Sequence, residues 1–195
     1  QTNDNDWNNN DKLHQLLFPS NNSPHSLSPL SLLKITRRLG TKTKALKFFE
    51  YIQANSPSPL EPPSLSPTFE AIFEFASLEQ PNSPSKLSEL LATSKDLNIP
   101  LTINSATLLV RCFGRAGMID KSVTVYKELD PVLQNTHIRN VLLGVLLRSG
   151  RVDDALQVLD EMLKLDAEFP PNETSIDIVF TALLKRDQSG RSVRE

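Results

Sequence analysis

Two stretches of this 195-residue chain repeat the same pattern of glycines, charges and apolar residues 33 positions apart. Residues 107–129 read TLLVRCFGRAGMIDKSVTVYKEL, and residues 140–162 read NVLLGVLLRSGRVDDALQVLDEM. Self-similarity at a period of about 20 to 50 residues is typical of repeat proteins. Their function generally lies along a surface built from equivalent positions rather than in one cleft. The matched positions are Leu109 and Leu142, Phe113 and Leu146, Arg115 and Arg148, Gly117 and Gly150, Ile119 and Val152, Asp120 and Asp153, Val123 and Leu156, Tyr126 and Leu159, and Leu129 and Met162.

The first copy predicts a pair of antiparallel helices. We expect Thr102 to cap a helix over 103–115, because its hydroxyl can accept a hydrogen bond from a free N–H group in the first turn of the helix. Gly117 is expected to end this helix, since glycine readily adopts the left-handed conformation that commonly follows a helix. We expect Asp120 to cap a second helix over 121–129.

The second copy predicts the same pair of helices further along the chain. They are expected over 136–148 and 154–165, with Gly150 as the turn glycine and Asp153 as the cap of the second helix. A third copy begins with an expected helix over 174–186, after which no partner helix is predicted. The repeated unit is therefore a helix pair, present twice in full and once in part.

The chain is predicted to be all-α, with antiparallel helix pairs stacked into a superhelix after a disordered N-terminal tail. No stretch alternates apolar and polar residues between turn signals, so we expect no β-sheet. The tail is rich in asparagine, serine and proline and cannot bury enough apolar surface to offset the entropy of ordering. The predicted parts are the disordered tail (1–28), a degenerate helical hairpin (31–54), a Pro-rich linker (55–67), a divergent helix pair (68–102), two repeats (103–135 and 136–172) and an incomplete repeat (173–195).

Composition excludes several classes of function. The formal net charge of −2, from 21 basic and 23 acidic residues, gives no strong general attraction to nucleic acid. The single cysteine, Cys112, excludes an intrachain disulfide and a cysteine-rich zinc site. No apolar run approaches the roughly 18 residues of a membrane-spanning helix, and no phosphate-binding glycine loop or catalytic triad is present. We therefore expect no enzymatic activity, no cofactor, no metal, no membrane and no small-molecule substrate.

The two ends of the sequence carry expectations of their own. The chain begins with Gln1 rather than methionine, which indicates processing or a fragment. Residues 1–30 contain aspartates and no arginine, unlike a transit peptide. At the other end, a stack of helix pairs needs a polar unit to cover its last face, so we expect the protein to continue beyond Glu195. An enzymatic domain in that continuation is a third, weaker alternative for the function.

The repeated segments resemble pentatricopeptide repeats. In that family the first helix ends in a turn made of a basic, a small and a glycine residue, and an acidic residue then leads into a second helix of the form Ala–Leu–x–x–Phe–x–x–Met. The segment LRSGRVDDALQVLDEM fits this pattern closely, and FGRAGMIDKSVTVYKEL fits it less closely. The Trp–x2–Leu–Gly–x2–Tyr signature of tetratricopeptide repeats is absent. The resemblance is strong over 103–190 and weaker back to Ser31.

The resemblance implies that each repeat reads one base of single-stranded RNA. The first helices line the groove in this family, and the fifth and last residues of a repeat together bind the Watson–Crick edge of a base. The second residue, usually valine or isoleucine, packs on the base. Thr107 with Asn135 resembles pairs that prefer adenine, and Asn140 with Asn172 resembles pairs that prefer pyrimidines. The implied base-reading residues are Thr107, Asn135, Asn140, Asn172 and Asp177, and the implied base-stacking residues are Asn104 and His137.

Two functions from different classes follow. The first is sequence-specific binding of a plant organellar transcript, in the mitochondrion or alternatively the chloroplast, which supports transcript stability, splicing or processing together with other RNA-processing proteins. The second is a helical-repeat scaffold that binds proteins and does not touch RNA. The balanced net charge favours the scaffold, whereas the polar fifth and last residues favour RNA. A basic groove would indicate RNA, and an apolar or acidic groove would indicate protein.

Overall fold

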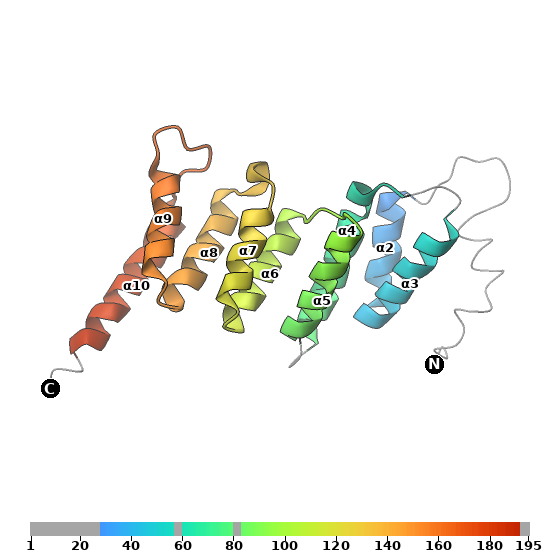
Figure 1. Ribbon diagram of the computed structural model, residues 1–195, viewed down its shortest axis with the longest axis horizontal. Helices are drawn as coiled ribbons and strands as arrows, with labels where there is room; N and C mark the ends of the chain where they lie inside the picture. The colour runs from blue at the N-terminus through green and yellow to red at the C-terminus, as the bar shows by residue number, and fades with distance from the viewer. Residues whose placement is uncertain (1–27, 57–59, 80–82, 192–195) are drawn as a thin grey trace. The chain divides into compact units, whose positions relative to one another are not determined.

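The computed structural model of the chain describes residues 28–56, 60–79 and 83–191. Except for Ser28, the predicted disordered tail at 1–28 lies outside these ranges. The described ranges form nine α-helices and one short 3-10 helix and contain no strand (Figure 1). The prediction of an all-α fold built from helix pairs is therefore confirmed.

The chain divides into two compact units, residues 1–81 with 89–100 and residues 82–88 with 101–195. The first unit contains α2 (Pro29–Leu39), α3 (Lys42–Asn55) and α4 (Pro62–Leu78), and α5 (Ser83–Asp96) contributes residues to both units. The second unit contains α6 (Ile103–Arg115), α7 (Ile119–Glu128), the 3-10 helix η2 (Pro131–Leu133), α8 (Thr136–Arg148), α9 (Val152–Leu163) and α10 (Glu173–Arg191).

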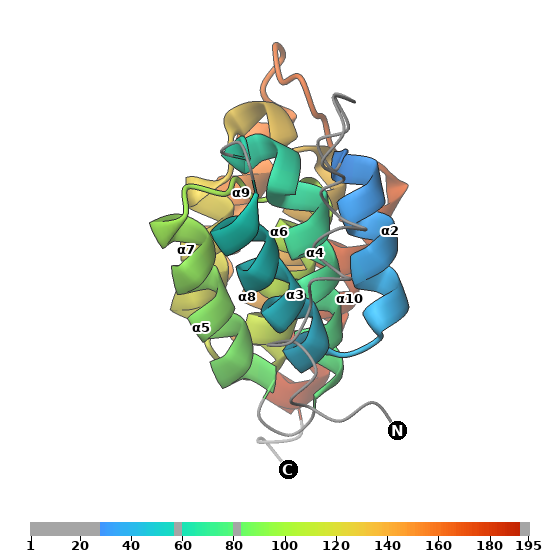
Figure 2. The ribbon, with the colours of Figure 1, turned by 90° about the vertical axis from the view of Figure 1, so that its right-hand side faces the viewer.

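In the first unit, α2 and α3 form the expected helical hairpin, which faces the viewer in Figure 2. Gly40 separates the two helices with a φ of 68°, a left-handed conformation that suits glycine. The Thr41 hydroxyl accepts a hydrogen bond from the Lys44 N–H at 3.4 Å and caps α3. The rings of Phe49 and Phe69 pack edge to face with their centroids 5.3 Å apart, which ties α3 to α4.

The Pro-rich linker expected over 55–67 is shorter than predicted, because α4 already begins at Pro62. Proline is tolerated in the first turn of a helix, where its missing N–H group would have no partner in any case. Pro67 also lies inside α4, and Ser66 beside it donates a hydrogen bond to the Pro100 carbonyl at 2.7 Å. The predicted end of the linker at residue 67 is therefore wrong, because the prolines from Pro62 onward lie within a helix and do not break it.

In the second unit, the first helix of each full repeat has the predicted bounds. The structure places α6 over 103–115 and α8 over 136–148. The Thr102 hydroxyl accepts from the Ser105 N–H at 3.1 Å, which confirms its role as a cap. Gly117 and Gly150 follow these helices with φ of 75° and 79°, so both turns need a residue that accepts the left-handed conformation.

The second helices begin two residues earlier than predicted. α7 starts at Ile119 and α9 at Val152, so Asp120 and Asp153 lie inside the first turn and are not caps. The residues at the cap positions make no side-chain cap hydrogen bond. An acidic side chain in the first turn is still favourable, because it interacts with the positive end of the helix dipole.

The first helix of the third repeat, α10, begins at Glu173 and continues to Arg191, five residues past the predicted end at 186. The start of α10 lies one residue before the start of the helix expected over 174–186. Small differences of this kind are common at helix ends.

The core of the second unit is built around α8, which packs against α6, α7, α9 and α10. The second helices α7 and α9 bury Val125, Tyr126, Val158 and Met162, and they also bury the small residues Ser122 and Ala155. The residue that follows Ala155, Leu156, is 46% exposed. Ser122 satisfies its hydroxyl by donating to the Val110 carbonyl of α6 at 3.0 Å. A small residue is needed here because the two helices of a repeat pack closely.

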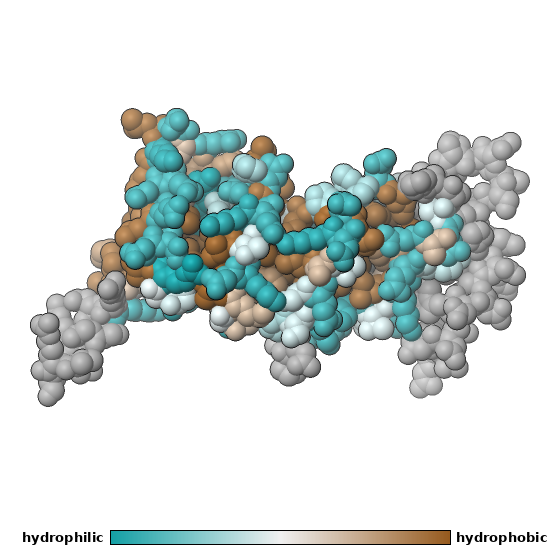
Figure 3. All heavy atoms as spheres, viewed as in Figure 1, coloured by the Kyte–Doolittle hydropathy of each residue, from teal (hydrophilic) through white to brown (hydrophobic). Residues whose placement is uncertain are grey.

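Hydrophilic side chains cover the face of α7 and α9 that is seen in Figure 3. The residues predicted to bind RNA lie elsewhere, on the first helices α6, α8 and α10 or immediately before them. The exposed charged residues of α7 and α9 include Lys121, Lys127, Glu128, Asp160 and Glu161.

Candidate functional site

The two last-position residues of the repeats are also the caps of the helices that follow them. Asn135 Oδ1 accepts a hydrogen bond from the Ile138 N–H at 3.2 Å at the start of α8. Asn172 Oδ1 accepts from the Ser175 N–H at 3.1 Å at the start of α10. Asparagine is a favoured capping residue because its side chain can satisfy a free N–H group of the first turn. The cap fixes where each of these amides stands relative to the helix.

The structure brings Asn140 and Asn172 together. Asn140 lies on α8 and is only 6% exposed. Its Nδ2 donates a hydrogen bond to Asn172 Oδ1 at 3.1 Å. The fifth and last residues of the second repeat, 32 residues apart in sequence, therefore form one polar cluster. Ser175, which sequence reasoning missed, joins this cluster with its Oγ 2.6 Å from Asn140 Oδ1.

No hydrogen bond joins the corresponding pair of the first repeat in the described part of the chain. Thr107 on α6 is 8% exposed, and its hydroxyl has no hydrogen-bond partner within the described ranges. Ile138 occupies the position three residues after the cap where α10 has Ser175. Because isoleucine offers no polar group, the hydroxyl of Thr107 finds none of the support that Asn140 receives.

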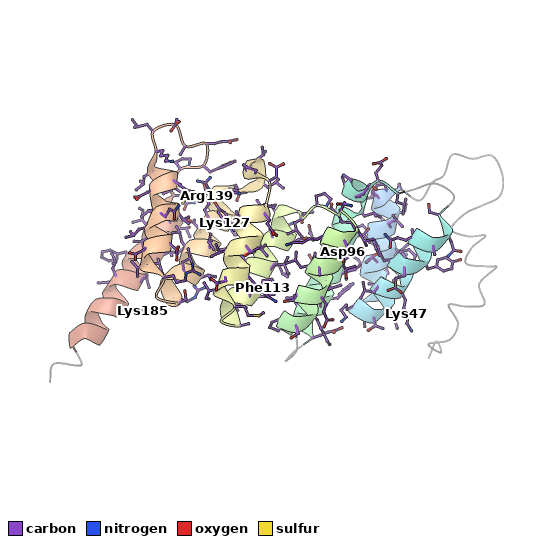
Figure 4. All side chains as sticks on the ribbon, viewed as in Figure 1. Lys47, Asp96, Phe113, Lys127, Arg139 and Lys185 are labelled. Carbon is purple, nitrogen blue, oxygen red and sulfur yellow. The ribbon has the colours of Figure 1, made fainter. Side chains whose placement is uncertain are left out.

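A groove of about 960 Å³ lies between α8 and α10, beside the start of α9. Asp177, the fifth residue of the third repeat, lines this groove and is exposed. Two cations and two acids face it: Arg148 and Lys185, which is labelled in Figure 4, and Asp153 and Asp177. The charge of the groove is therefore balanced, and it does not by itself distinguish RNA from protein as the ligand.

The two residues predicted to pack on bases, Asn104 and His137, are both exposed at the second position of α6 and α8. Thr174 is the equivalent residue of α10, and it lines the groove. The three side chains thus occupy matching positions at the start of successive first helices. The exposed imidazole of His137 offers a flat surface for stacking that Asn104 lacks.

Arg151 joins the turns of the two repeats. Its Nη1 lies 2.5 Å from Asp120 Oδ1, and its Nε donates to Asp154 Oδ2 at 2.6 Å. Hydrogen bonds to Asp154 and then to Asp120 raise the pKa of the Arg151 guanidinium. Asp120 and Asp154, at the starts of α7 and α9, therefore both form ion pairs with Arg151. In the described residues, no group of three His, Cys, Asp or Glu side chains could hold a metal ion.

Cys112 lies half-buried on α6. Burial raises the pKa of its thiol, and Arg115 and Arg111 lower it by a smaller amount. Because the thiolate is the reactive form, we expect iodoacetamide to alkylate Cys112 more slowly than a free cysteine at about pH 8. Mass spectrometry of timed samples measures the rate, and unfolding in urea should restore it. A native rate equal to that of free cysteine would contradict this prediction.

Among residues 28–56, 60–79 and 83–191, no helix is both long enough and apolar enough to cross a membrane. The family model for the PPR repeat matches residues 105–130 and 138–166, which correspond to the helix pairs α6–α7 and α8–α9. Two pentatricopeptide repeat-containing proteins of Arabidopsis thaliana, one of them named as mitochondrial, are each 45% identical to the chain over 181 residues. These alignments cover 92% of this chain and 23% of each relative, so the chain spans less than a quarter of their length. The chain belongs to the pentatricopeptide repeat family.

Proposed function

We propose that this chain binds single-stranded RNA along the first helices of its repeats. Pentatricopeptide repeat proteins are in general organellar RNA-binding proteins and are not enzymes. The observation that carries the proposal is the contact between Asn140 and Asn172 at 3.1 Å, because these are the two residues expected to read one base. Two side chains held together can bind the edge of the same base simultaneously.

The position of the groove supports this proposal. It is lined by Gly144, one helical turn after Asn140, and by Thr174, two residues after Asn172. A base that contacts the asparagine pair would therefore lie next to an open space between two first helices. The short polar side chains at the fifth and last positions can donate and accept hydrogen bonds, which is what discrimination among bases requires.

The proposed base preferences follow the residue pairs. Asn140 with Asn172 is proposed to select a pyrimidine, and Thr107 with Asn135 is proposed to select adenine. Asp177 would contribute to reading the next base. The exposed side chains of Asn104 and His137 are proposed to pack against the bases read by their own repeats.

The proposed ligand is an organellar transcript, whose stability, splicing or processing the protein would support with other RNA-processing proteins. We propose the mitochondrion as the compartment because the name of one relative, 45% identical to this chain, places that relative there. The chloroplast is the alternative compartment.

Crosslinking to RNA in isolated plant organelles tests the proposal. The full-length tagged protein is compared with its Thr107→Ala/Asn140→Ala double variant. We expect a defined transcript with the wild-type protein and about tenfold less of it with the double variant, because each lost base contact removes discrimination energy. A thermal melt of both proteins checks that the double variant keeps its fold, since both side chains are buried.

Two other results would contradict parts of the proposal. Equal recovery of the transcript would retain RNA binding but refute the assignment of Thr107 and Asn140. Recovery of proteins without any RNA would support the second candidate, a protein-binding scaffold. The balanced charge of the groove is compatible with this second candidate as well as with RNA binding.

A further inference from the structure

A third side chain connects Asn140 with Asn172. Ser175, in the first turn of α10, is fully buried, and its Oγ lies 2.6 Å from Asn140 Oδ1 and 3.1 Å from Asn172 Oδ1. The backbone N–H of Asn172 donates to the same Oγ at 3.0 Å. The hydroxyl has one proton to donate, and the shorter distance assigns that proton to Asn140 Oδ1.

One backbone group fixes the orientation of both amides. The Ser175 backbone N–H can only donate, so the Asn172 atom that it meets at 3.1 Å must be the oxygen Oδ1. This oxygen also accepts from Asn140 Nδ2, which directs Asn140 Oδ1 toward the Ser175 hydroxyl. Turning the Asn140 amide over would place two acceptor oxygens against each other. The amide of Asn140 is therefore held at both its ends.

The groups that this network leaves free are mainly donors. Within the described part of the chain, no hydrogen bond uses the Nδ2 protons of Asn172, and only one bond uses those of Asn140. Free N–H groups complement acceptor oxygens and nitrogens, which a pyrimidine presents at O2 and, in cytosine, at N3. The orientation of the amides therefore decides which base edge the pair can bind.

We propose that Ser175 is a positioning residue for RNA recognition, which sets the base selectivity of the second repeat from within the third. It need not touch the base, because it acts by fixing the donor and acceptor ends of Asn140. This inference rests on the proposed function, in which Asn140 and Asn172 read one base. With the hydroxyl removed, a single hydrogen bond to Asn172 would hold the Asn140 amide, which could then pivot.

The first repeat provides an internal contrast. Thr107 is its fifth residue, and the position that Ser175 occupies in the third repeat is occupied in the second repeat by Ile138. The buried hydroxyl of Thr107 has no hydrogen-bond partner in the described residues. A hydroxyl without a partner can rotate and present either its proton or a lone pair. The base that faces Thr107 is therefore selected less sharply than the base that faces Asn140.

Selection from a random pool of single-stranded RNA tests the role of Ser175 in the full-length protein. We expect Ser175→Ala to reduce the base preference at one position of the selected motif by about fivefold, close to the value of one hydrogen bond. The preferences at the other positions should not change. Ser175→Thr keeps the hydroxyl and should keep the wild-type preference.

Ser105→Ala is the matched control. Ser105 is buried at the same position of α6, and its Oγ lies 3.0 Å from the capping hydroxyl of Thr102, as Ser175 lies beside Asn172. Equal and uniform loss of binding in Ser105→Ala and Ser175→Ala, with lower melting temperatures, would show a structural role and overturn the proposal. An unchanged motif in Ser175→Ala would also overturn it. If the wild-type protein selects no motif, the proposed function itself fails, and this inference fails with it.

Discussion

Replacing Phe113 with alanine is expected to lower the free energy of unfolding by about 4 kcal/mol. Phe113, labelled in Figure 4, lies on α6 and is completely buried. Alanine would lose the transfer energy of the ring and leave a cavity that the surrounding helices can fill only in part. It would also remove the contact with Lys121, whose Nζ lies 5.8 Å from the ring centroid. Urea denaturation of the chain, followed by circular dichroism, measures the loss.

Phe113→Leu is the matched control for this prediction. Leu146 is the equivalent residue of the second repeat and is also completely buried, so leucine is compatible with this position of a repeat. The expected loss is about 1 kcal/mol, because much of the apolar volume is kept. If Phe113→Ala unfolds no more easily than Phe113→Leu, the core of the second unit does not depend on this ring.

Replacing Gly114 with leucine is expected to lower the free energy of unfolding by about 2 kcal/mol. A Cβ atom at this position would collide with Val145 on α8, coming within 2.8 Å of Cγ1 and closer still to Cγ2. A leucine in a helix is favoured over glycine by about 1 kcal/mol, but overpacking of a tight contact commonly costs up to about 3 kcal/mol. The collision therefore decides the sign of the effect.

A double-mutant cycle with Val145→Ala measures this collision directly. Val145 is 2% exposed, and its truncation alone should destabilise the chain because it leaves a cavity. In the Gly114→Leu/Val145→Ala protein the new side chain can occupy part of that space, so the double variant should be more stable than the sum of the single effects predicts. Simple additivity of the two changes would show that α6 and α8 are not in close contact here. The matching residue of the second repeat is Leu147, so the repeat pattern alone tolerates leucine at this position.

Most helix positions were predictable from local sequence signals. The bounds of α6 and α8 follow from Thr102, Gly117 and Gly150, because a cap and a left-handed glycine act within a few residues of the helix end. The errors also arose locally. The acidic residue Asp120 resembles a cap but lies in the first turn of α7, where an acid is also favourable. Pro62 resembles part of a linker but starts α4, because proline is tolerated in the first turn of a helix.

The candidate site was predicted only in part, and it remains a proposal. The repeat pattern placed Asn140 at the fifth position and Asn172 at the last position of the second repeat. It gave no reason to include Ser175, since serine three residues after a cap has an ordinary local role. The lack of a hydrogen-bond partner for the Thr107 hydroxyl could not be predicted either. It depends on which residue the next repeat places opposite, and in this chain that residue is Ile138.

The sequence by itself determined the all-α fold, the family and the residues at the fifth and last positions, because period, caps and turn glycines are local properties of the chain. Only the tertiary structure decided that Ser175 holds Asn140, that Arg151 joins Asp120, and that Gly114 must stay small beside Val145. Each of these contacts joins residues about 30 positions apart. Their energies depend on how one helix pair packs on the next, which the period of a repeat does not specify.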